Sequence, residues 1–189
     1  MEGFFYCPVL IRIGTKAMKY EFDGDKYKQA SSQQKTWGKK LISELKLKGN
    51  ERILDLGCGD GVLTAELAEH VPDGFVLGID ASASMIETAG RDHTGRNVQF
   101  ELLDINAIDF DSEFDVVFSN ATLHWIKDHS RLLSNVFKSL KSGGLVRFQF
   151  AAEGNCTNLI SVLQEIISEK AYAGYFNEFD WPWYMPAPE

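Results

Sequence analysis

Three glycines at alternate positions, Gly57, Gly59 and Gly61, lie between an apolar run and a stretch of helical periodicity. A side chain at these positions would obstruct a tight turn or the close approach of a ligand to the backbone. Asp80 lies nineteen residues beyond Gly61, at the end of the next apolar run. A carboxylate there can accept hydrogen bonds from both hydroxyls of a ribose. Together these residues predict a nucleotide-binding site between a strand and a helix.

The spacing of the glycines indicates which nucleotide this site would take. In a dinucleotide site, the pattern G-x-G-x-x-G brings a pyrophosphate to the helix N-terminus, whereas here the third glycine comes one residue early. Asp55 and Asp60 lie beside the glycines, and their charges would repel a pyrophosphate. A ligand with a cationic sulfonium and an ammonium group would be favoured instead. The glycine loop therefore predicts S-adenosylmethionine, and its spacing disfavours an NAD-dependent oxidoreductase.

Short apolar runs alternate with longer amphipathic stretches along the chain, which is typical of βαβ units and a parallel sheet. The fold class is therefore α/β. The predicted strands are residues 52–56, 75–79, 98–102, 114–119 and 145–150. The predicted helices are residues 32–47, a helix after the glycine loop, a helix that begins near Ser82 or Ser84 with a capping box over 84–87, and residues 130–140 and 157–169.

The helix predicted at 130–140 is expected to stop at the glycines of residues 142–144. Its periodicity directs five side chains toward the core, namely Leu132, Leu133, Val136, Phe137 and Leu140.

Several segments resemble the signature motifs of class I S-adenosylmethionine-dependent methyltransferases. Residues 53–61, ILDLGCGDG, resemble the first motif, and further matches follow in chain order at 78–85, GIDASASM, at 103–105, LDI, at 114–120, FDVVFSN, and at 140–144, LKSGG. The resemblance covers roughly residues 27–150. It implies a Rossmann-like, mostly parallel sheet flanked by helices, with S-adenosylmethionine as the cofactor.

The resemblance also implies a set of cofactor-binding residues on this chain. They are Tyr27, Asp55, Gly57, Gly59, Asp80, Ala81, Met85, Asp104, Ile105 and Asn120. Within this set the glycines would line the methionine end, with backbone contacts from Asn120, and Asp80 would bind the ribose. Met85 would pack near the adenine, Asp104 would accept from its amino group, and the backbone amide of Ile105 would reach a ring nitrogen. Without the resemblance, Met85 reads equally well as a core methionine and Asp104 as a helix cap.

Two further segments suggest the kind of methyl acceptor. Residues 27–34, YKQASSQQ, and 119–125, SNATLHW, resemble the corresponding segments of trans-aconitate, juvenile-hormone-acid and malonyl-carrier-protein methyltransferases, which methylate carboxylates. By this resemblance Tyr27, Gln34 and Trp125 would lie near the cofactor and the acceptor. The alternative readings are a surface glutamine on an amphipathic helix and a core tryptophan.

His124 precedes Trp125 and invites a role as general base. A carboxylate acceptor is already ionised at neutral pH and needs no base. Its methylation requires in-line positioning and the exclusion of water. An alcohol or amine acceptor would need a base, and His124 is then the first candidate. The predicted catalytic set is therefore Gln34, His124 and Trp125.

Composition narrows the classes of partner. The net charge is −8, although residues 16–48 hold nine lysines and four acids, so the remainder carries −13. Nucleic acid normally requires a broad basic face, so a nucleic-acid partner is disfavoured. No apolar run reaches the roughly 20 residues of a membrane span. Three widely spaced cysteines suggest neither disulfides nor a metal site, so we expect a reducing, cytoplasmic setting without metal.

The chain divides into three parts in this interpretation. Residues 1–17 form an apolar N-terminal extension, 18–150 the S-adenosylmethionine-binding domain, and 151–189 a helix with an aromatic, proline-rich tail. The family resemblance implies an antiparallel hairpin after the fifth strand, but the 39 residues that follow residue 150 predict none, so we expect a truncated cap segment there. The exposed fifth strand would invite pairing. We expect residues 4–13, the aromatic tail or a second subunit in a homodimer to cover it.

The sequence therefore predicts a class I S-adenosylmethionine-dependent methyltransferase that acts on a small-molecule or carrier-linked carboxylate. The alternative is a cofactor-binding module without turnover, because the acceptor region is missing. The net negative charge outside residues 16–48 disfavours a nucleic-acid methyltransferase of the same fold.

Overall fold

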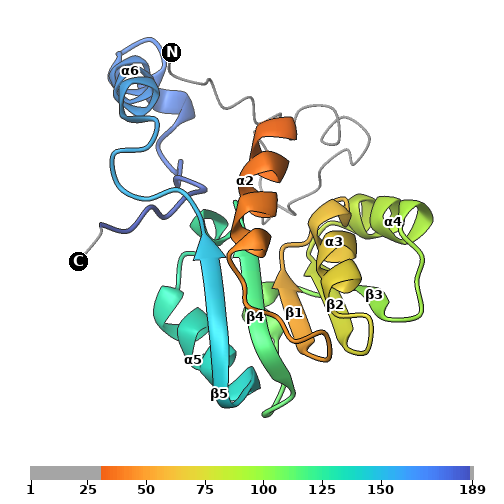
Figure 1. The fold of residues 1–189 in the computed structure, drawn as a ribbon. Coiled ribbons are helices and arrows are strands. Elements are labelled where there is room, and N and C mark those ends of the chain that lie inside the picture. The colour runs from red at the N-terminus through yellow and green to blue at the C-terminus, as the bar shows by residue number, and fades with distance from the viewer. Residues whose placement is uncertain (1–30, 188–189) are drawn as a thin grey trace.

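The computed structural model describes residues 31–187, and they contain one five-stranded sheet in which every pairing is parallel. The strand order is β3-β2-β1-β4-β5, with helices on both faces (Figure 1). The strands are β1 (Arg52–Leu56), β2 (Phe75–Asp80), β3 (Val98–Leu102), β4 (Phe114–Asn120) and β5 (Leu140–Gln149). The α/β class and the mostly parallel, Rossmann-like sheet predicted from sequence are confirmed. Tyr27 and residues 1–17 lie outside the described part of the chain.

Helices and short turns of 3₁₀-helix connect these strands. The helices are α2 (Ser32–Ser43), α3 (Val62–His70), α4 (Ala83–Asp92), α5 (His129–Ser139) and α6 (Thr157–Ser168), and the turns are η1 (Ile105–Ala107), η2 (Leu123–Trp125) and η3 (Ala173–Tyr175). The helix α2 is shorter than the predicted 32–47. The helix α4 begins after Ser82, whose side chain accepts a hydrogen bond from the amide of Met85 at 3.3 Å. The capping box predicted over 84–87 is therefore wrong, because the capping residue lies two positions earlier.

The sheet order creates a switch point between β1 and β4. The chain moves outward through β2 and β3 on one side of β1, then returns to build β4 and β5 on the other side. Ile53, Leu54 and Asp55 pair with Val116, Val117 and Phe118 across the junction. Ligands of open parallel sheets bind outside the carboxyl ends of the strands at such a point. The glycine loop follows β1 and therefore lies at the switch point.

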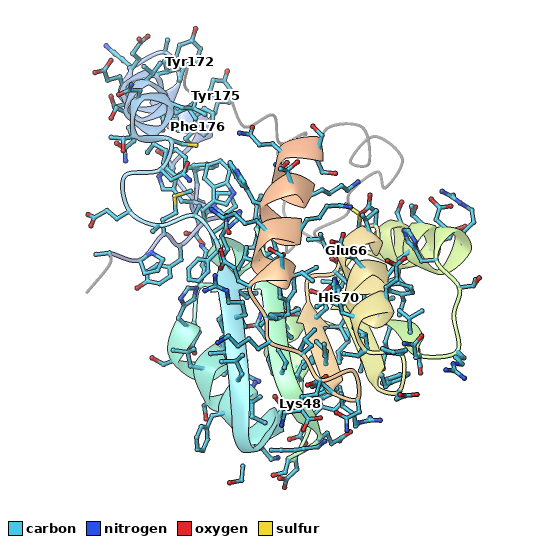
Figure 2. The ribbon with its side chains drawn as sticks, viewed as in Figure 1. Lys48, Glu66, His70, Tyr172, Tyr175 and Phe176 are labelled. Carbon is cyan, nitrogen blue, oxygen red and sulfur yellow. The ribbon has the colours of Figure 1, made fainter. Side chains whose placement is uncertain are left out.

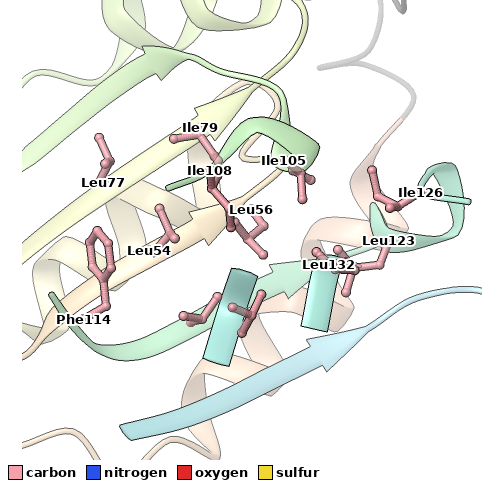
Figure 3. Close-up of a cluster of buried hydrophobic side chains, with 12 residues drawn as sticks. Leu54, Leu56, Leu77, Ile79, Ile105, Ile108, Phe114, Leu123, Ile126 and Leu132 are labelled. Atoms are coloured by element: carbon pink, nitrogen blue, oxygen red, sulfur yellow. The ribbon is translucent and has the colours of Figure 1, made fainter. Parts of the chain in front are cut away.

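Two buried clusters fix the sheet between its helices. On one face, the helices α2 and α3 pack on the alternate side chains of β1, β2 and β4, including Ile53, Val76 and Phe118. The other face is covered by η1, η2 and α5 (Figure 3), and its cluster comprises Leu54, Leu56, Leu77, Ile79, Ile105, Ile108, Phe114, Val117, Leu123, Ile126, Leu132 and Val136. Both faces of the central strands are thus apolar, as expected for a parallel sheet.

The strand β5 begins at Leu140, five residues before the predicted start, so Gly143 and Gly144 lie within it. Its register slips between two pairs: Phe114 pairs with Leu140, whereas Val116 pairs with Leu145. The surplus residues of β5 form a bulge, and Gly143 there has a φ of +80°. The predicted helix stop at 142–144 is therefore wrong, because a bulge favours the same glycine-rich composition as the end of a helix.

The helix α5 buries only one of the two apolar rows predicted to face the core. Leu132 and Val136 are buried, whereas Leu133 is 54% exposed and Phe137 is 82% exposed. The buried pair lies four residues apart, on the line of α5 that meets the sheet. Leu133 and Phe137 lie one position further round the helix, where no described element covers them.

The C-terminal segment extends beyond the carboxyl end of β5 (Figure 1). The helix α6 buries none of its residues, and it exposes an apolar row of Leu159, Val162 and Ile166. Tyr172, Tyr175 and Phe176 follow on the part that stands apart from the sheet (Figure 2). The chain then returns toward η2. No antiparallel strand follows β5 within residues 31–187.

Candidate cofactor and acceptor site

The glycine loop is tied to β2 by its own backbone. The amides of Gly57 and Cys58 both donate to the carbonyl of Ile79, each at 2.9 Å. Gly57 has a φ of +72°, and a Cβ on it would collide with the side chain of Thr122. The hydroxyl of Thr122 donates to the Gly57 carbonyl at 3.2 Å. The first glycine therefore lets the segment after β4 pack directly on the loop.

Asp80 is held against the same loop by two backbone amides. The amide of Gly59 donates to one carboxylate oxygen at 3.0 Å, and the amide of Ser82 donates to the other at 2.9 Å. Each oxygen keeps further acceptor capacity. The carboxylate is thus oriented beside the glycine loop before any ligand arrives, with Ala81 next to it. This geometry fits the two neighbouring hydroxyls of a ribose.

The third glycine serves packing. Gly61 precedes α3 with a φ of +80°, and a Cβ on it would lie 2.8 Å from atoms of Ala89 and Phe100. It therefore brings α3 close to α4 and β3, the role expected of the last glycine in such a loop.

The two acidic residues beside the loop differ in their electrostatics. Asp55 is buried, and burial raises its pKa to about 7, with the Thr64 hydroxyl opposing the shift through a 2.7 Å hydrogen bond and Asp80 adding to it. Asp60 forms an ion pair with Lys35, at 2.6 Å. The expectation of two bare carboxylates beside the loop is therefore wrong, because Asp55 is partly protonated at neutral pH and Asp60 is paired with Lys35. The ligand preference of the loop therefore depends on Asp55, Asp60 and Asp80 together with Lys35.

A small cavity of about 30 Å³ lies between α2 and the loop. It is large enough for one water-sized group. Two acceptor atoms there, the side-chain oxygens of Gln34 and Asn120, are buried and accept no hydrogen bond within the described structure. The lining residues are Gln34, Lys35, Asp55, Gly57, Cys58, Gly59, Asp60, Leu63 and Asn120. Unsatisfied buried acceptors beside a carboxylate fit the ammonium of an amino acid.

A larger hollow of about 510 Å³ lies elsewhere, at the amino ends of β1 and β4 and beside the bulge of β5. None of the residues predicted to bind cofactor or acceptor lines it. Ligands of parallel sheets bind at the opposite, carboxyl edge. The small cavity at the glycine loop is therefore the one that bears on function.

The residues predicted to contact adenine lie at the carboxyl edge of β2 and β3. Met85 is only 3% exposed, and Ile105 is 5% exposed and belongs to the core cluster around α5. One oxygen of Asp104 accepts from the amide of Asn106 at 2.8 Å, which caps η1. Met85 is thus a core methionine and Asp104 a helix cap, as the alternative interpretations predicted. The adenine contacts of these residues stay predictions.

The predicted acceptor side follows β4. Ala121, just after Asn120, has a φ of +58°, a strained conformation for a residue with a side chain. Burial lowers the pKa of His124 to about 4, so the imidazole is neutral at pH 7, and its Nδ1 has no partner within the described structure. The ring of Trp125 meets Trp183 of the tail edge-on, with centroids 5.8 Å apart. The aromatic tail therefore covers the acceptor side.

Three further contacts tie the tail to this region. The amide of Tyr184 donates to the carbonyl of His124 at 2.8 Å, and the Tyr184 ring packs on His129 at 4.9 Å. Asp180 forms an ion pair with Lys127. These contacts lie at the carboxyl end of the sheet, whereas Leu145 and Val146 of β5 stay about half exposed. One expectation from the sequence was that the aromatic tail covers the edge strand. The tail does not cover β5 along its length.

The structure gathers most of the predicted site residues at one edge of the sheet. Gln34, Asn120 and the glycine loop share the small cavity, and the side-chain amide of Asn120 donates to the backbone carbonyl of Gln34 at 3.0 Å. Sequence reasoning missed Lys35, Thr64 and Thr122. No sequence signal singles out Lys35, because five other cations lie between it and the glycine loop, namely Lys39, Lys40, Lys46, Lys48 and Arg52.

Comparison with known proteins agrees with this geometry. Residues 47–179 match the family model described as a methyltransferase domain. The chain belongs to this family. It is 42% identical over 101 residues to the trans-aconitate 2-methyltransferase of Deinococcus radiodurans, covering 53% of this chain and 38% of that protein. It is 35% identical over 133 residues to the malonyl-[acyl-carrier protein] O-methyltransferase of Acetivibrio thermocellus, covering 69% of this chain and 47% of that protein.

A solved S-adenosylmethionine-dependent methyltransferase from Aquifex aeolicus is also similar to this methyltransferase domain. The TM-score is 0.56 at 26% identity, with 64% of this chain and 69% of that chain covered. The present chain spans about half the length, or less, of the curated relatives that it matches.

The cofactor of this methyltransferase domain is S-adenosylmethionine. The residues present fit it, because Asp80 is poised for a ribose diol and orphaned acceptors surround the small cavity. Among the described residues, no group of three or more His, Cys, Asp or Glu side chains could hold a metal ion. No helix within 31–187 is both long and apolar enough to span a bilayer.

Proposed function

We propose that this protein transfers the methyl group of S-adenosylmethionine to a carboxylate oxygen of a small or carrier-linked acid. The observation that carries the choice of acceptor is His124, the imidazole beside Trp125, whose burial lowers its pKa to about 4. So weak a base suits an acceptor that arrives already ionised, as a carboxylate does at neutral pH. Relatives named for trans-aconitate and malonyl-carrier-protein methylation support the same class.

The residues of the chain would act mainly by positioning. S-adenosylmethionine, when bound, supplies an electrophilic methyl group on a cationic sulfur. Asp80 would hold the ribose, and the side-chain oxygens of Gln34 and Asn120 would orient the amino-acid end. Trp125 and Trp183 exclude water on the acceptor side.

The anionic oxygen of the acceptor would take up the methyl group that the bound cofactor supplies, and the sulfur would leave as a thioether. The products are a neutral ester and a neutral thioether. Because both charges disappear in this step, a site that excludes water favours the reaction.

A second candidate is a module that binds the cofactor without turnover. The observation that favours it is the packing of Trp183 on Trp125, which fills the predicted acceptor side with side chains of the chain itself. The two candidates share the cofactor site and differ in the acceptor site. A measurement of methyl transfer to an acceptor distinguishes the two candidates, because only the enzyme forms product.

The test incubates the protein with S-adenosylmethionine and a panel of acids, each paired with its amide. The panel contains trans-aconitate, a malonyl carrier-protein thioester and short and long monocarboxylic acids. We expect methyl esters from at least one acid and no product from its amide, as read by mass spectrometry. His124→Gln should lower kcat by less than about threefold, whereas loss of a general base costs about 10²- to 10⁴-fold.

Two outcomes would contradict the proposal. Methylation of an alcohol or amine, at a rate that depends strongly on His124, would point to base-assisted transfer. Cofactor binding without product from any acid would favour the module without turnover.

A further inference from the structure

The ion pair between Lys35 and Asp60 joins α2 to the glycine loop at the mouth of the cofactor site. The Lys35 ammonium lies 2.6 Å from the Asp60 carboxylate, and the side chains are 17% and 5% exposed. Ion pairs on open surfaces contribute little, whereas pairs shielded from water interact more strongly. Both residues line the small cavity beside Gly57 and Gly59. The pair is therefore part of the site rather than of the solvated surface.

The cavity presents groups of two kinds within one small space. Lys35 supplies a cation with several N–H donors, and among the described residues that line this cavity it is the only Lys or Arg. Asp60 supplies a carboxylate, and Gln34 and Asn120 supply the buried acceptor oxygens. An α-amino acid group carries a carboxylate and an ammonium on one carbon. The groups around the cavity are complementary to both of its charges, and the space of about 30 Å³ itself has room for one of the two, the ammonium.

We propose that Lys35 binds the carboxylate of the amino-acid end of S-adenosylmethionine, while Asp60, Gln34 and Asn120 receive its ammonium. Lys35 keeps its contact with Asp60, so the cofactor bridges a pair of charges that is already in place. Such preorganisation lowers the cost of ordering the site when the ligand binds. Lys35 is thus a positioning residue of the cofactor on α2, ahead of the glycine loop in sequence.

The alternative reading is a purely structural pair that fastens α2 over the loop. The two interpretations differ in which ligands bind more weakly when Lys35 is replaced. S-adenosylmethionine and its decarboxylated form differ only in the carboxylate. A structural role would affect both ligands equally, whereas the proposed contact affects only the complete one.

The experiment measures the binding of both ligands by calorimetry to the wild-type chain and to Lys35→Met. We expect the variant to bind S-adenosylmethionine about 10- to 100-fold more weakly, the size of one lost charge-assisted contact. Its affinity for the decarboxylated ligand should stay within about twofold of the wild-type value. Lys35→Arg, which keeps the charge, should recover most of the affinity for S-adenosylmethionine.

Two further variants serve as controls. Lys39 lies one turn later on α2, is 56% exposed and pairs with Glu66 at 3.1 Å, so Lys39→Met should change neither affinity. Asp80→Ala removes the proposed ribose contact, which both ligands share, so it should weaken both equally. Thermal denaturation without ligand checks that each variant is folded.

Equal losses for the two ligands in Lys35→Met would overturn the proposal, as would unchanged binding. Tighter binding of S-adenosylmethionine would also overturn it, because Lys35 would then compete with the ligand ammonium for Asp60. The inference rests on the cofactor and not on the proposed carboxylate acceptor. Since no acceptor is present in the experiment, failure of the proposed function would leave its outcome unaffected.

Discussion

Single residues at the glycine loop carry charges that depend on their surroundings. Asp55 is only 2% exposed, and burial raises its pKa from 3.8 to about 7. The folded state therefore holds the Asp55 proton more tightly than the unfolded state. This contribution to stability is present below the unfolded pKa, declines as the pH rises, and is lost above the folded pKa. Asp55, within the nucleotide motif, thus makes the fold less stable at neutral pH.

Asp55→Asn should remove this pH dependence. We expect the variant to be about 2–4 kcal/mol more stable than the wild type at pH 8, and nearly equal to it at pH 4, because the wild-type side chain is then neutral. Urea denaturation at several pH values measures the difference. Asp73→Asn is the matched control, because that side chain is exposed. A stability difference that did not vary with pH would show that Asp55 titrates normally in the folded state.

At the scale of elements, the loop after β1 and the segment after β4 are built to interlock. Gly57 adopts a φ of +72° beneath the side chain of Thr122. Gly90 in α4 is the opposite case, since a Cβ there would meet nothing within 4 Å. The two positions separate a glycine that the site requires from one that a helix merely tolerates.

Gly57→Ala should therefore destabilise the fold, and Gly90→Ala should stabilise it. In Gly57→Ala, the positive φ costs about 1–3 kcal/mol for a residue with a side chain, and the new Cβ also collides with Thr122. Gly90→Ala gains about 0.5–1 kcal/mol, the difference between glycine and alanine within a helix. Chemical denaturation of both variants measures the two effects. A neutral Gly57→Ala would mean that the loop can move away from Thr122 at little cost.

At the scale of the whole molecule, β5 is an edge strand of the sheet that carries exposed apolar side chains. Leu145 pairs with Val116 and Val146 with Val117, so the two side chains lie on opposite faces of the sheet. They are 50% and 43% exposed. The outer rows of α5 and α6 are also exposed and apolar. An apolar strand with one unpaired edge is prone to associate.

We expect a second copy of the chain to cover this edge at micromolar concentrations. Sedimentation should show association that Val146→Lys abolishes, since an edge lysine opposes strand pairing. Leu102→Lys on β3, at the other edge, is the matched control and should leave association unchanged, because Leu102 is similarly exposed at 54%. Hydrogen exchange adds a second measurement. Rapid exchange along the whole outer side of β5 at high concentration would exclude a covered edge.

Patterns confined to short stretches of sequence determined much of this protein. The starts of the first four strands agree with those of the structure, because each is an apolar run between turn residues. The glycines and Asp80 predicted the nucleotide site, because a tight turn against a ligand tolerates no side chain. The errors came where one local pattern serves two structures, as with Gly143 and Gly144, which suit a bulge as well as a helix end.

Only the tertiary structure decided which groups meet. Lys35 and Asp60 lie 25 positions apart, and their contact depends on how α2 crosses the loop. The pKa of Asp55 depends on layers that exclude water around it, and the exposure of Phe137 depends on the absence of a described neighbour on that side of α5. Local sequence selects backbone conformation, whereas charge pairing and burial arise from contacts between segments distant along the chain.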